Sequence, residues 1–282
     1  MKSNMKVVVF LPEAGFTVKQ LEEIGPAVFY GEKVKDETEL IDKCLNAEAV
    51  LATWGRTGML SAKFFDSLPK LKFVSIYSTG YDWVDIEAAR RNKVVVSYCP
   101  GYSTAAVADW TMSMIEKLCK PNGKTIGIIG LGRIGMAVAA KATRIGMKVA
   151  AWDRLQKTAY QMPLEKLLRE SDVASIHLAL GKETINFIGE REIAMMKNGA
   201  ILINSAREPL VDNNALAKAL QSGKLAGAAV DLDYHSKTIL PKNAITTPHT
   251  AFNSLESTRL GNEMFVQNFV WWRNGKGQNK LT

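Results

Sequence analysis

The chain is poor in cysteine and has no long apolar run, and each shortage excludes a class of protein. Cys44, Cys99 and Cys119 are odd in number and lack the paired spacing of metal ligands. They are typical of buried or free thiols in a reducing cytoplasm, and no metal site is predicted. No apolar run approaches the roughly 20 residues of a membrane span. The run that ends at Pro12 is too short for a signal peptide, so we expect a cytoplasmic protein without membrane contact.

Charge is not concentrated in one region either. Lys and Arg outnumber Asp and Glu by 36 to 28, a formal net charge of +8 that favours anionic partners in general. The basic residues are scattered rather than clustered with aromatic residues, which argues against a specific nucleic-acid partner. The length of 282 residues allows two domains with a substantial core.

What the sequence does have is a regular alternation of apolar runs with stretches of helical spacing. Strands are predicted at Val7 to Leu11, Ala27 to Tyr30, Ala49 to Trp54, Phe73 to Tyr77, Val94 to Cys99, Val173 to Leu178, Ala200 to Ser205, Leu225 to Leu232 and Ala244 to Thr247. A helix is expected from Ser103 to Lys120, with Ser103 as N-cap, crossing between domains. A last helix, about Ser254 to Arg273, carries aromatic residues at helical spacing, typical of packing. The alternation predicts parallel sheets.

The most specific motif lies in the middle of the chain. An apolar strand from Thr125 is followed by the turn Gly130-x-Gly132-x-x-Gly135 and then by a helix of small residues. Such a unit binds a dinucleotide: one glycine makes the tight turn, one lets the backbone approach the pyrophosphate, and one brings helix against strand. Taken alone, the turn is equally compatible with a glycine-rich turn that has no ligand.

An acid at the end of the following strand strengthens this interpretation. Asp153 lies 18 residues beyond Gly135. There a carboxylate accepts hydrogen bonds from both ribose hydroxyls and repels a 2′-phosphate, so NAD is the predicted cofactor. Arg154 directly after it keeps NADP as the less favoured alternative.

Two later stretches place a reactive side chain just after a predicted strand. They are Ile203-Asn-Ser-Ala-Arg-Glu-Pro-Leu-Val-Asp212 and Thr246-Thr-Pro-His-Thr-Ala251. The carboxyl ends of strands border the ligand crevice in an open α/β sheet, so Arg207 and His249 are expected to face the nicotinamide. Taken singly, Arg207 is more typical of a surface loop and His249 of a hydrogen-bonded core. His177 and His235 are interpreted as structural.

Together these motifs resemble those of the D-isomer-specific 2-hydroxyacid dehydrogenases over nearly the whole chain. The resemblance also covers Ser78-Thr-Gly-Tyr-Asp-Trp-Val-Asp85, Pro100-Gly-Tyr-Ser103, Val107-Ala-Asp109, Met196-Lys-x-Gly-Ala-x-Leu-Ile-Asn204, Ala206-Arg207, Asp231 and Pro248-His249. It implies an α/β fold of two Rossmann-like domains with parallel sheets. The substrate (catalytic) domain is then discontinuous, residues 1–102 and 254–282, and residues 103–253 form the NAD-binding Rossmann domain.

The resemblance also implies roles for single residues in a hydride transfer between NAD(H) and a small 2-oxo or D-2-hydroxy acid. Arg207 pairs with the substrate carboxylate, and His249 exchanges a proton with the carbonyl oxygen. The other residues that it assigns are Gly80 and Tyr81 at the carboxylate, Asp231 at the nicotinamide carboxamide, Arg133 and Ile134 at the pyrophosphate, and Ser205 and Leu178 at the ring and adenosine sides. Purely structural alternatives remain for three of them: Asp231 as a strand cap, Tyr81 as a space-filling side chain, and Gly80 as a turn residue that requires positive φ.

The chain departs from the family pattern around the histidine. Tyr234 stands where a glutamate normally orients the imidazole, and Asp233 replaces that glutamate if the loop shifts register by one. Without such a carboxylate we expect the reductive reaction to fail at lower pH than is usual for the family. Glu208 stands where a glycine normally follows the arginine and is expected to compete for Arg207 when no substrate is bound.

Partners and substrate are less specified. The segment from Asp109 to Gly123 is shorter than the family norm, which there carries a dimerisation arm, so a homodimer is only a possible assembly. Aromatic residues at Trp54, Tyr81, Trp83 and Tyr102 favour compact acids of the glyoxylate or hydroxypyruvate type over phosphoglycerate. The rival interpretation is a non-catalytic, NAD-responsive binding protein similar to the corepressors of this fold. Intact arginine and histidine and the lack of an appended interaction tail favour the enzyme.

Overall fold

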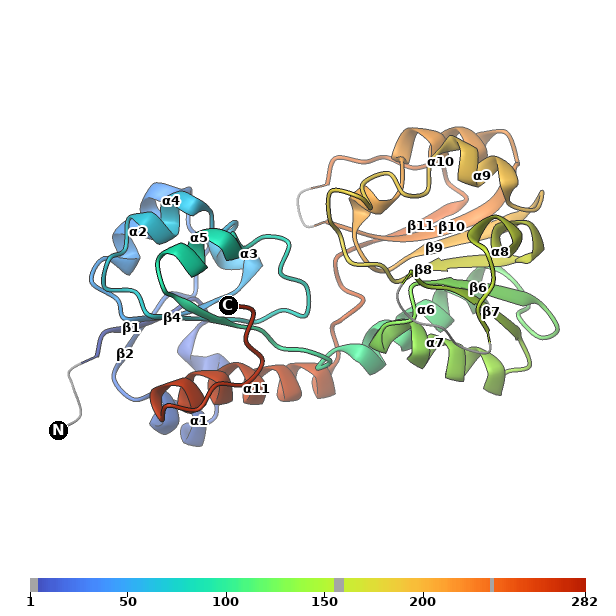
Figure 1. Ribbon diagram of the computed structural model, residues 1–282. Helices are drawn as coiled ribbons and strands as arrows, with labels where there is room; N and C mark the ends of the chain where they lie inside the picture. Colours follow the sequence, from blue (N-terminus) through green and yellow to red (C-terminus); the bar gives the residue numbers. More distant parts are fainter. Residues whose placement is uncertain (1–4, 155–159, 234–235) are drawn as a thin grey trace. The chain divides into compact units, whose positions relative to one another are not determined.

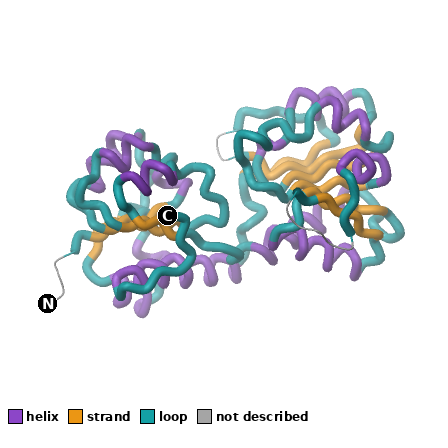
Figure 2. The backbone as a smooth tube through the Cα atoms, in the orientation of Figure 1, coloured by secondary structure: helices purple, strands orange, loops and turns teal. Residues whose placement is uncertain are grey.

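The computed structural model describes residues 5–154, 160–233 and 236–282, and it divides into two compact units (Figure 1). Unit 1 comprises Met1–Tyr102 and Leu255–Thr282, and unit 2 comprises Ser103–Ser254. Each unit is built on a parallel sheet with helices on its faces (Figure 2). The α/β class with two parallel sheets is therefore confirmed.

The sheet of unit 1 has the strand order β2-β1-β3-β4-β5, and every neighbouring pair is parallel. Its strands are almost entirely apolar because helices cover both faces. The strands are β1 (Val7–Val9), β2 (Ala27–Phe29), β3 (Ala49–Ala52), β4 (Phe73–Ile76) and β5 (Val95–Ser97). The helices are η1 (Glu13–Gly15), α1 (Val18–Ile24), α2 (Glu37–Cys44), α3 (Trp54–Thr57), α4 (Ala62–Asp66), α5 (Ile86–Arg91) and α11 (Leu255–Arg273).

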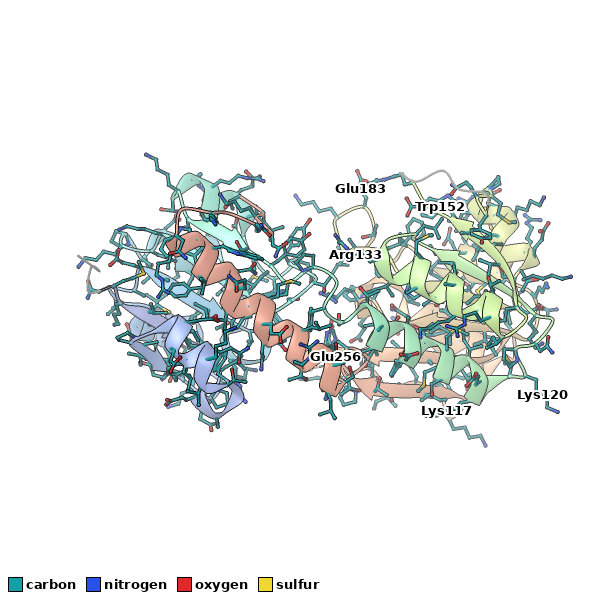
Figure 3. The ribbon with its side chains drawn as sticks, turned by 90° about the horizontal axis from the view of Figure 1, so that it is seen from below. Lys117, Lys120, Arg133, Trp152, Glu183 and Glu256 are labelled. Carbon is teal, nitrogen blue, oxygen red and sulfur yellow. The ribbon has the colours of Figure 1, made fainter. Side chains whose placement is uncertain are left out.

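The C-terminal helix α11 belongs to unit 1 because its aromatic stripe packs on this sheet. The rings of Phe73 and Trp272 stack 4.8 Å apart, and Phe265 and Phe269 are buried. Figure 3 shows α11 running across the unit, with Glu256 in its first turn. The expected packing role of the stripe is confirmed.

The sheet of unit 2 has the order β11-β10-β9-β8-β6-β7, again with parallel neighbours throughout. Helices α6 and α7 cover one face, and α8, α9 and α10 cover the other (Figure 1). The strands are β6 (Thr125–Ile129), β7 (Lys148–Trp152), β8 (Val173–Ile176), β9 (Ala200–Asn204), β10 (Leu225–Leu232) and β11 (Ala244–Pro248). The helices are α6 (Thr104–Leu118), α7 (Arg133–Arg144), α8 (Leu164–Glu170), α9 (Glu190–Met195), η2 (Glu208–Leu210) and α10 (Asn213–Gln221).

Three details differ from the expectations. Helix α6 lies wholly in unit 2 instead of crossing between domains, and Ser254 also lies in unit 2. Ser103 occupies the N-cap position of α6, but its side chain makes no capping hydrogen bond. Its φ of −103° and ψ of 6° are not the extended conformation that directs a cap side chain at the helix N–H groups.

The order of unit 2 creates a topological switch point. The chain leaves β6 toward β7 on one side and returns to β8 on the other side. The turns after β6 and β8 therefore diverge, and the carboxyl edge between them is where ligands bind in open α/β sheets. Within the described ranges, no helix combines the length and apolar character needed to cross a bilayer.

Candidate functional site

Three glycines follow β6, and the local packing requires only two of them. Gly130 has φ +101°, and a Cβ there would lie 2.7 Å from the backbone oxygen of His177. A Cβ at Gly135 would lie 2.0 Å from the Gly130 oxygen, so glycine is needed for α7 to approach the strand. A Cβ at Gly132 would meet no atom within 4 Å. The protein itself does not fill the space at Gly132, which leaves it open to a ligand.

The N-terminus of α7 is uncapped. Gly132 is its N-cap residue and no side chain caps the helix, whose first turn carries no acidic residue. The first N–H groups, including those of Arg133 and Ile134, therefore keep the partial positive charge of a helix start. Arg133 stands at this end of the helix (Figure 3). Open N–H groups beside an arginine suit a pyrophosphate.

Asp153 follows β7 directly and is held against the glycine turn. Its Oδ2 accepts a hydrogen bond from the Leu131 backbone N–H at 2.7 Å. Leu178, the second residue after β8, borders the same turn, because its Cδ2 lies 3.0 Å from where a Cβ of Gly130 would be. Arg154 forms an ion pair with Glu183, and both side chains are largely exposed. The carboxylate and Leu178 thus flank the turn in positions compatible with an adenosine ribose.

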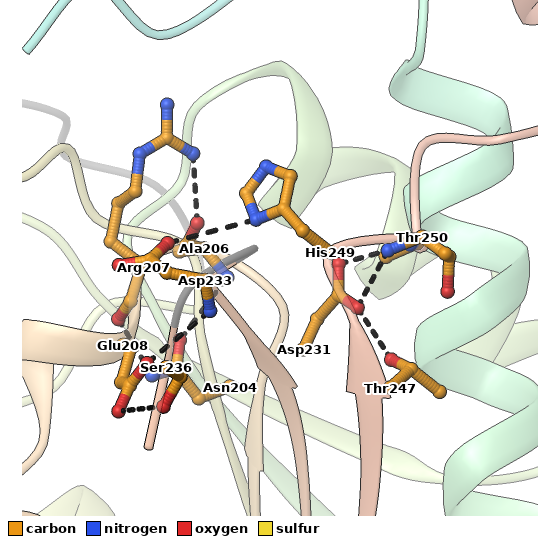
Figure 4. A network of polar contacts seen from close by, with 11 residues as sticks. Asn204, Ala206, Arg207, Glu208, Asp231, Asp233, Ser236, Thr247, His249 and Thr250 are labelled. Atoms are coloured by element: carbon orange, nitrogen blue, oxygen red, sulfur yellow. Dashed lines mark hydrogen bonds and ion pairs between the residues drawn. The ribbon is translucent and has the colours of Figure 1, made fainter. Parts of the chain in front are cut away.

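Arg207 is presented by a turn that Asn204 organises at the end of β9. The Asn204 side-chain amide donates to the Arg207 backbone oxygen at 2.7 Å, and its Oδ1 accepts from the Ala206 N–H at 3.1 Å. The guanidinium donates to the Ala206 oxygen at 2.9 Å and projects beyond the strand (Figure 4). Ser205 is instead tied to α6, since its Oγ lies 3.2 Å from Oγ1 of buried Thr111.

His249 follows β11 in a strained backbone conformation with φ +53°. Asp231, at the end of β10, is 4% exposed and holds this turn. Its carboxylate accepts from the N–H groups of Thr250 at 2.8 Å and Ala251 at 2.9 Å, and from the Thr247 hydroxyl. Left-handed residues other than glycine persist where the surroundings over-determine them, as here. These contacts are those expected if Asp231 only caps the strand end. Its contact with the nicotinamide carboxamide stays a prediction.

In the described part of the chain, the carboxylate of Asp233 lies within ion-pair range of His249. Its Oδ1 lies 3.7 Å from His249 Nδ1, within ion-pair range but longer than a hydrogen bond. The exposed fraction is 42% for the aspartate side chain and 20% for the histidine. Figure 4 shows the imidazole and the Arg207 guanidinium projecting to the same side of the strand ends. Tyr234, the residue at the expected glutamate position, lies outside the described residues.

Glu208 does not have the surroundings that the sequence suggested. Its carboxylate accepts hydrogen bonds from Asn213 Nδ2 at 2.9 Å, Asp233 N at 3.2 Å, Ser236 Oγ at 2.8 Å and the Thr238 hydroxyl. Burial opposes its ionisation, but these hydrogen bonds outweigh burial and hold the pKa of the carboxyl below its ordinary value.

The expected competition of Glu208 for Arg207 is therefore wrong, because Asn213, Asp233, Ser236 and Thr238 engage the carboxylate. Sequence reasoning missed its partners Ser236 and Thr238. The available signal was chemical: an acid inside an otherwise apolar, buried motif needs donors, and two hydroxyl residues follow Asp233 closely.

His177 lies beside the glycine turn without exposing its ring nitrogens. Its Nε2 is 2.8 Å from Ser175 Oγ. Burial lowers the pKa of the imidazole to about 4, so the ring is neutral at physiological pH. His235 lies outside the described residues.

The turn of Gly80 and Tyr81 is in unit 1, after β4. The Gly80 oxygen accepts from Ser78 Oγ at 2.6 Å and from the Trp83 indole at 3.1 Å. Gly80 is not among the glycines with positive φ, so that alternative is wrong. Trp83 is buried, whereas Tyr81 is 46% exposed, which leaves Tyr81 as the accessible ring of this turn.

Thiols and metal ligands add no further site. Cys44 and Cys99 are buried and Cys119 is partly exposed, all three as free thiols. In the part of the chain that the structure describes, no group of three His, Cys, Asp or Glu residues is placed to hold a metal ion.

Comparisons with known proteins identify the family of the chain. Residues 99–251 match the family model of the D-isomer specific 2-hydroxyacid dehydrogenase, NAD binding domain. The chain is 30% identical to a glyoxylate reductase of Korarchaeum cryptofilum, over 98% of this chain and 94% of that protein. It is 29% identical to a hydroxypyruvate reductase of Blautia hydrogenotrophica, over 98% and 99% of the two chains. A crystal structure of NAD⁺-bound 3-phosphoglycerate dehydrogenase from Entamoeba histolytica matches with a TM-score of 0.88 and 25% identity, over 99% of this chain and 98% of that one.

Proposed function

The chain belongs to the D-isomer specific 2-hydroxyacid dehydrogenase family, and from this premise we propose that it reduces small 2-oxo acids with NADH to D-2-hydroxy acids. The proposed substrates are of the glyoxylate or hydroxypyruvate type, the acids for which two of its relatives are named. Unit 2 is the NAD-binding domain, and unit 1 is proposed as the substrate domain.

Arg207 and His249 are the proposed catalytic residues, and their common direction carries the proposal. Both follow strands of one sheet, β9 and β11, and both project from its carboxyl edge on the same side (Figure 4). A guanidinium offers a planar fork to the substrate carboxylate. The imidazole then gives its proton to the carbonyl oxygen as the carbonyl carbon is reduced, and takes it back in the oxidation.

The residues around the glycine turn fit a dinucleotide. The open N-terminus of α7 and the unfilled space at Gly132 suit the pyrophosphate. Asp153 is proposed to accept hydrogen bonds from the adenosine ribose and so to favour NAD over NADP. When bound, NADH supplies the hydride. Leu178, Ser205 and Asp231 are proposed to line the nucleotide, and the Gly80–Tyr81 turn to hold the substrate carboxylate through its backbone N–H groups.

Assembly and location are proposals as well. We propose a homodimer, which a monomeric mass in light scattering would refute. The free thiols favour a reducing cytoplasm, and no specific nucleic-acid partner is proposed. Binding to nucleic acid that disappears at modest salt would mark any such contact as incidental.

The test is NADH oxidation with glyoxylate, hydroxypyruvate, pyruvate and longer 2-oxo acids. We expect Arg207→Ala and His249→Ala each to lower kcat/KM by about a thousandfold, because one removes the carboxylate contact and the other the proton donor. Arg191→Ala is the matched control, an exposed arginine of the same unit paired with Glu165. Tight NADH binding without turnover of any acid would instead favour the NAD-responsive binding protein.

A further inference from the structure

Glu208 joins the turn that carries Arg207 to Asp233, the residue beside His249. It follows Arg207 in the chain, and its side chain accepts the backbone N–H of Asp233, 25 residues away. The exposed fraction of Glu208 is 9%. The groups that donate to its carboxylate are the Asp233 N–H, the Asn213 side-chain amide and the hydroxyls of Ser236 and Thr238, and all of them are uncharged. A buried carboxylate is retained only where hydrogen bonds replace its water, so this arrangement depends on those donors being in place.

The donors of Glu208 are also bonded to one another. Ser236 N–H donates to the Asp233 oxygen at 2.9 Å, and Thr238 N–H donates to Ser236 Oγ at 3.1 Å. Asn213, the first residue of α10, donates to Thr238 Oγ1 at 3.0 Å as well as to Glu208. Asp233, Ser236 and Thr238 thereby all contact Glu208 of η2, and Thr238 also contacts Asn213 of α10. Figure 4 shows Glu208 with Asp233 and Ser236.

Asp233 needs such fastening to act on His249. Its side chain is short, 42% exposed and separated from Nδ1 by 3.7 Å, so hydration and side-chain conformational entropy both work against the contact. Holding the Asp233 backbone in place reduces the entropy lost when its carboxylate stays beside the imidazole. Among the described residues, Figure 4 also draws Asp231, whose carboxylate is occupied by the N–H groups of Thr250 and Ala251, and Arg207 on the side of the imidazole.

We propose that Glu208 is a positioning residue that keeps Asp233 beside His249. The inference rests on the proposed function, in which His249 exchanges the proton.

The first test needs no substrate. The chain has three histidines, so the carbon-bound ring protons of His249 can be followed by NMR through a pH titration and assigned with His249→Asn. Asp233→Asn is expected to move the His249 midpoint to lower pH, because a neighbouring carboxylate favours the imidazolium. Glu208→Ala should move it in the same direction and no further, and Glu208→Gln, which keeps one acceptor oxygen, should restore part of the difference.

The second test is a double-mutant cycle on turnover. Asp233→Asn and Glu208→Ala are each expected to lower kcat roughly tenfold, the usual effect of removing a carboxylate that orients a histidine, with NADH affinity unchanged. If Glu208 acts through Asp233, the double variant is no slower than Asp233→Asn alone. Additive losses would overturn the inference, as would an unmoved His249 titration in Glu208→Ala.

Two further variants keep the test decisive. Glu192→Gln is the control: its carboxylate accepts the Gly189 N–H at 3.1 Å at the start of α9 in the same unit, so it should change stability without moving the His249 titration. Should Glu208→Ala fail to fold, Ser236→Ala combined with Thr238→Val removes two donors and should give the same shift. If no 2-oxo acid is turned over by the unmodified protein, the proposed function fails while the titration still decides the role of Glu208.

Discussion

The first five strands of each unit follow the same order in its sheet, yet the residues after the first strand differ between the two units. Unit 1 has the order β2-β1-β3 around its first strand, and unit 2 has the matching order β7-β6-β8. Register makes the two places equivalent, since Val9 pairs with Phe29 in unit 1 and Ile129 pairs with Trp152 in unit 2. The next residues are Phe10 and Tyr30 in unit 1, and Gly130 and Asp153 in unit 2.

Aromatic rings fill this position in unit 1. Phe10 and Tyr30 stack with ring centroids 5.5 Å apart, and the Lys43 ammonium lies 4.2 Å from the centre of the Tyr30 ring. In unit 2 the same position holds a glycine with φ +101° and a carboxylate turned toward the turn.

The helices that follow these two turns also differ, α1 being capped by side chains and α7 not. Helix α1 satisfies its own N-terminus with a capping box, in which Thr17 Oγ1 accepts from the Gln20 N–H and the Gln20 side chain accepts from the Thr17 N–H. Helix α7 has no side-chain cap. The comparison teaches that the fold supplies two potential nucleotide sites, and that a few turn residues decide which one stays open.

The largest expected effects come from replacing single glycines of the turn after β6, Gly130 to Gly135, here called the open turn. These replacements should separate the requirements of packing from those of NADH binding. Gly135→Ala puts a methyl group 2.0 Å from a backbone oxygen, so we expect a loss of about 3 kcal/mol in the free energy of unfolding. Gly132→Ala meets no protein atom within 4 Å, so stability should stay within about 0.5 kcal/mol. Its NADH affinity should nevertheless fall about tenfold or more, since the methyl group blocks the approach of the pyrophosphate.

Urea denaturation and NADH fluorescence titration measure the two quantities. Gly15→Ala in the equivalent turn of unit 1 is the control, because a Cβ there also meets nothing within 4 Å. It should leave NADH affinity unchanged. Normal NADH binding by Gly132→Ala would contradict the assignment of the open turn.

Removing the N-cap side chain of α1 should have a smaller effect, on stability alone. Thr17→Ala is expected to destabilise unit 1 by about 1 kcal/mol, the usual cost of losing an N-cap hydrogen bond. Faster amide exchange in Val18–Ile24 would report the loss. The comparison would be weakened if NADH affinity changed as well, since α1 would then take part in binding.

The smallest expected effect concerns Arg154, the residue after Asp153, which has no counterpart in unit 1. Arg154 follows Asp153 and pairs with exposed Glu183, so its charge is partly neutralised. Glu183→Gln should raise kcat/KM for NADPH relative to NADH by about threefold, because exposed pairs contribute little. Glu165→Gln removes a similar exposed partner, from Arg191, and is the control. An unchanged ratio of the two cofactors would mean that Arg154 does not face the 2′ position.

Several features could be read from the sequence because they are local. Strand positions followed from apolar runs that bury both faces, and the predicted runs from Val7 to Cys99 each contain an observed strand. The glycine turn and Asp153 follow from spacing within one strand-turn-helix unit. The ends of β9 and β11 located Arg207 and His249, because parallel strands bring their carboxyl ends to one edge.

Only the tertiary structure decided how these residues are held. Sequence separation gives no indication that Glu208 accepts from Asp233, Ser236 and Thr238 rather than facing Arg207, since the partners of a buried carboxylate depend on how distant loops close. The same holds for Asp231, whose carboxylate supports the strained turn at His249 across two strands. Periodicity determines which elements form and which face they bury, whereas hydrogen-bond partners between loops are set by three-dimensional proximity, which no local pattern encodes.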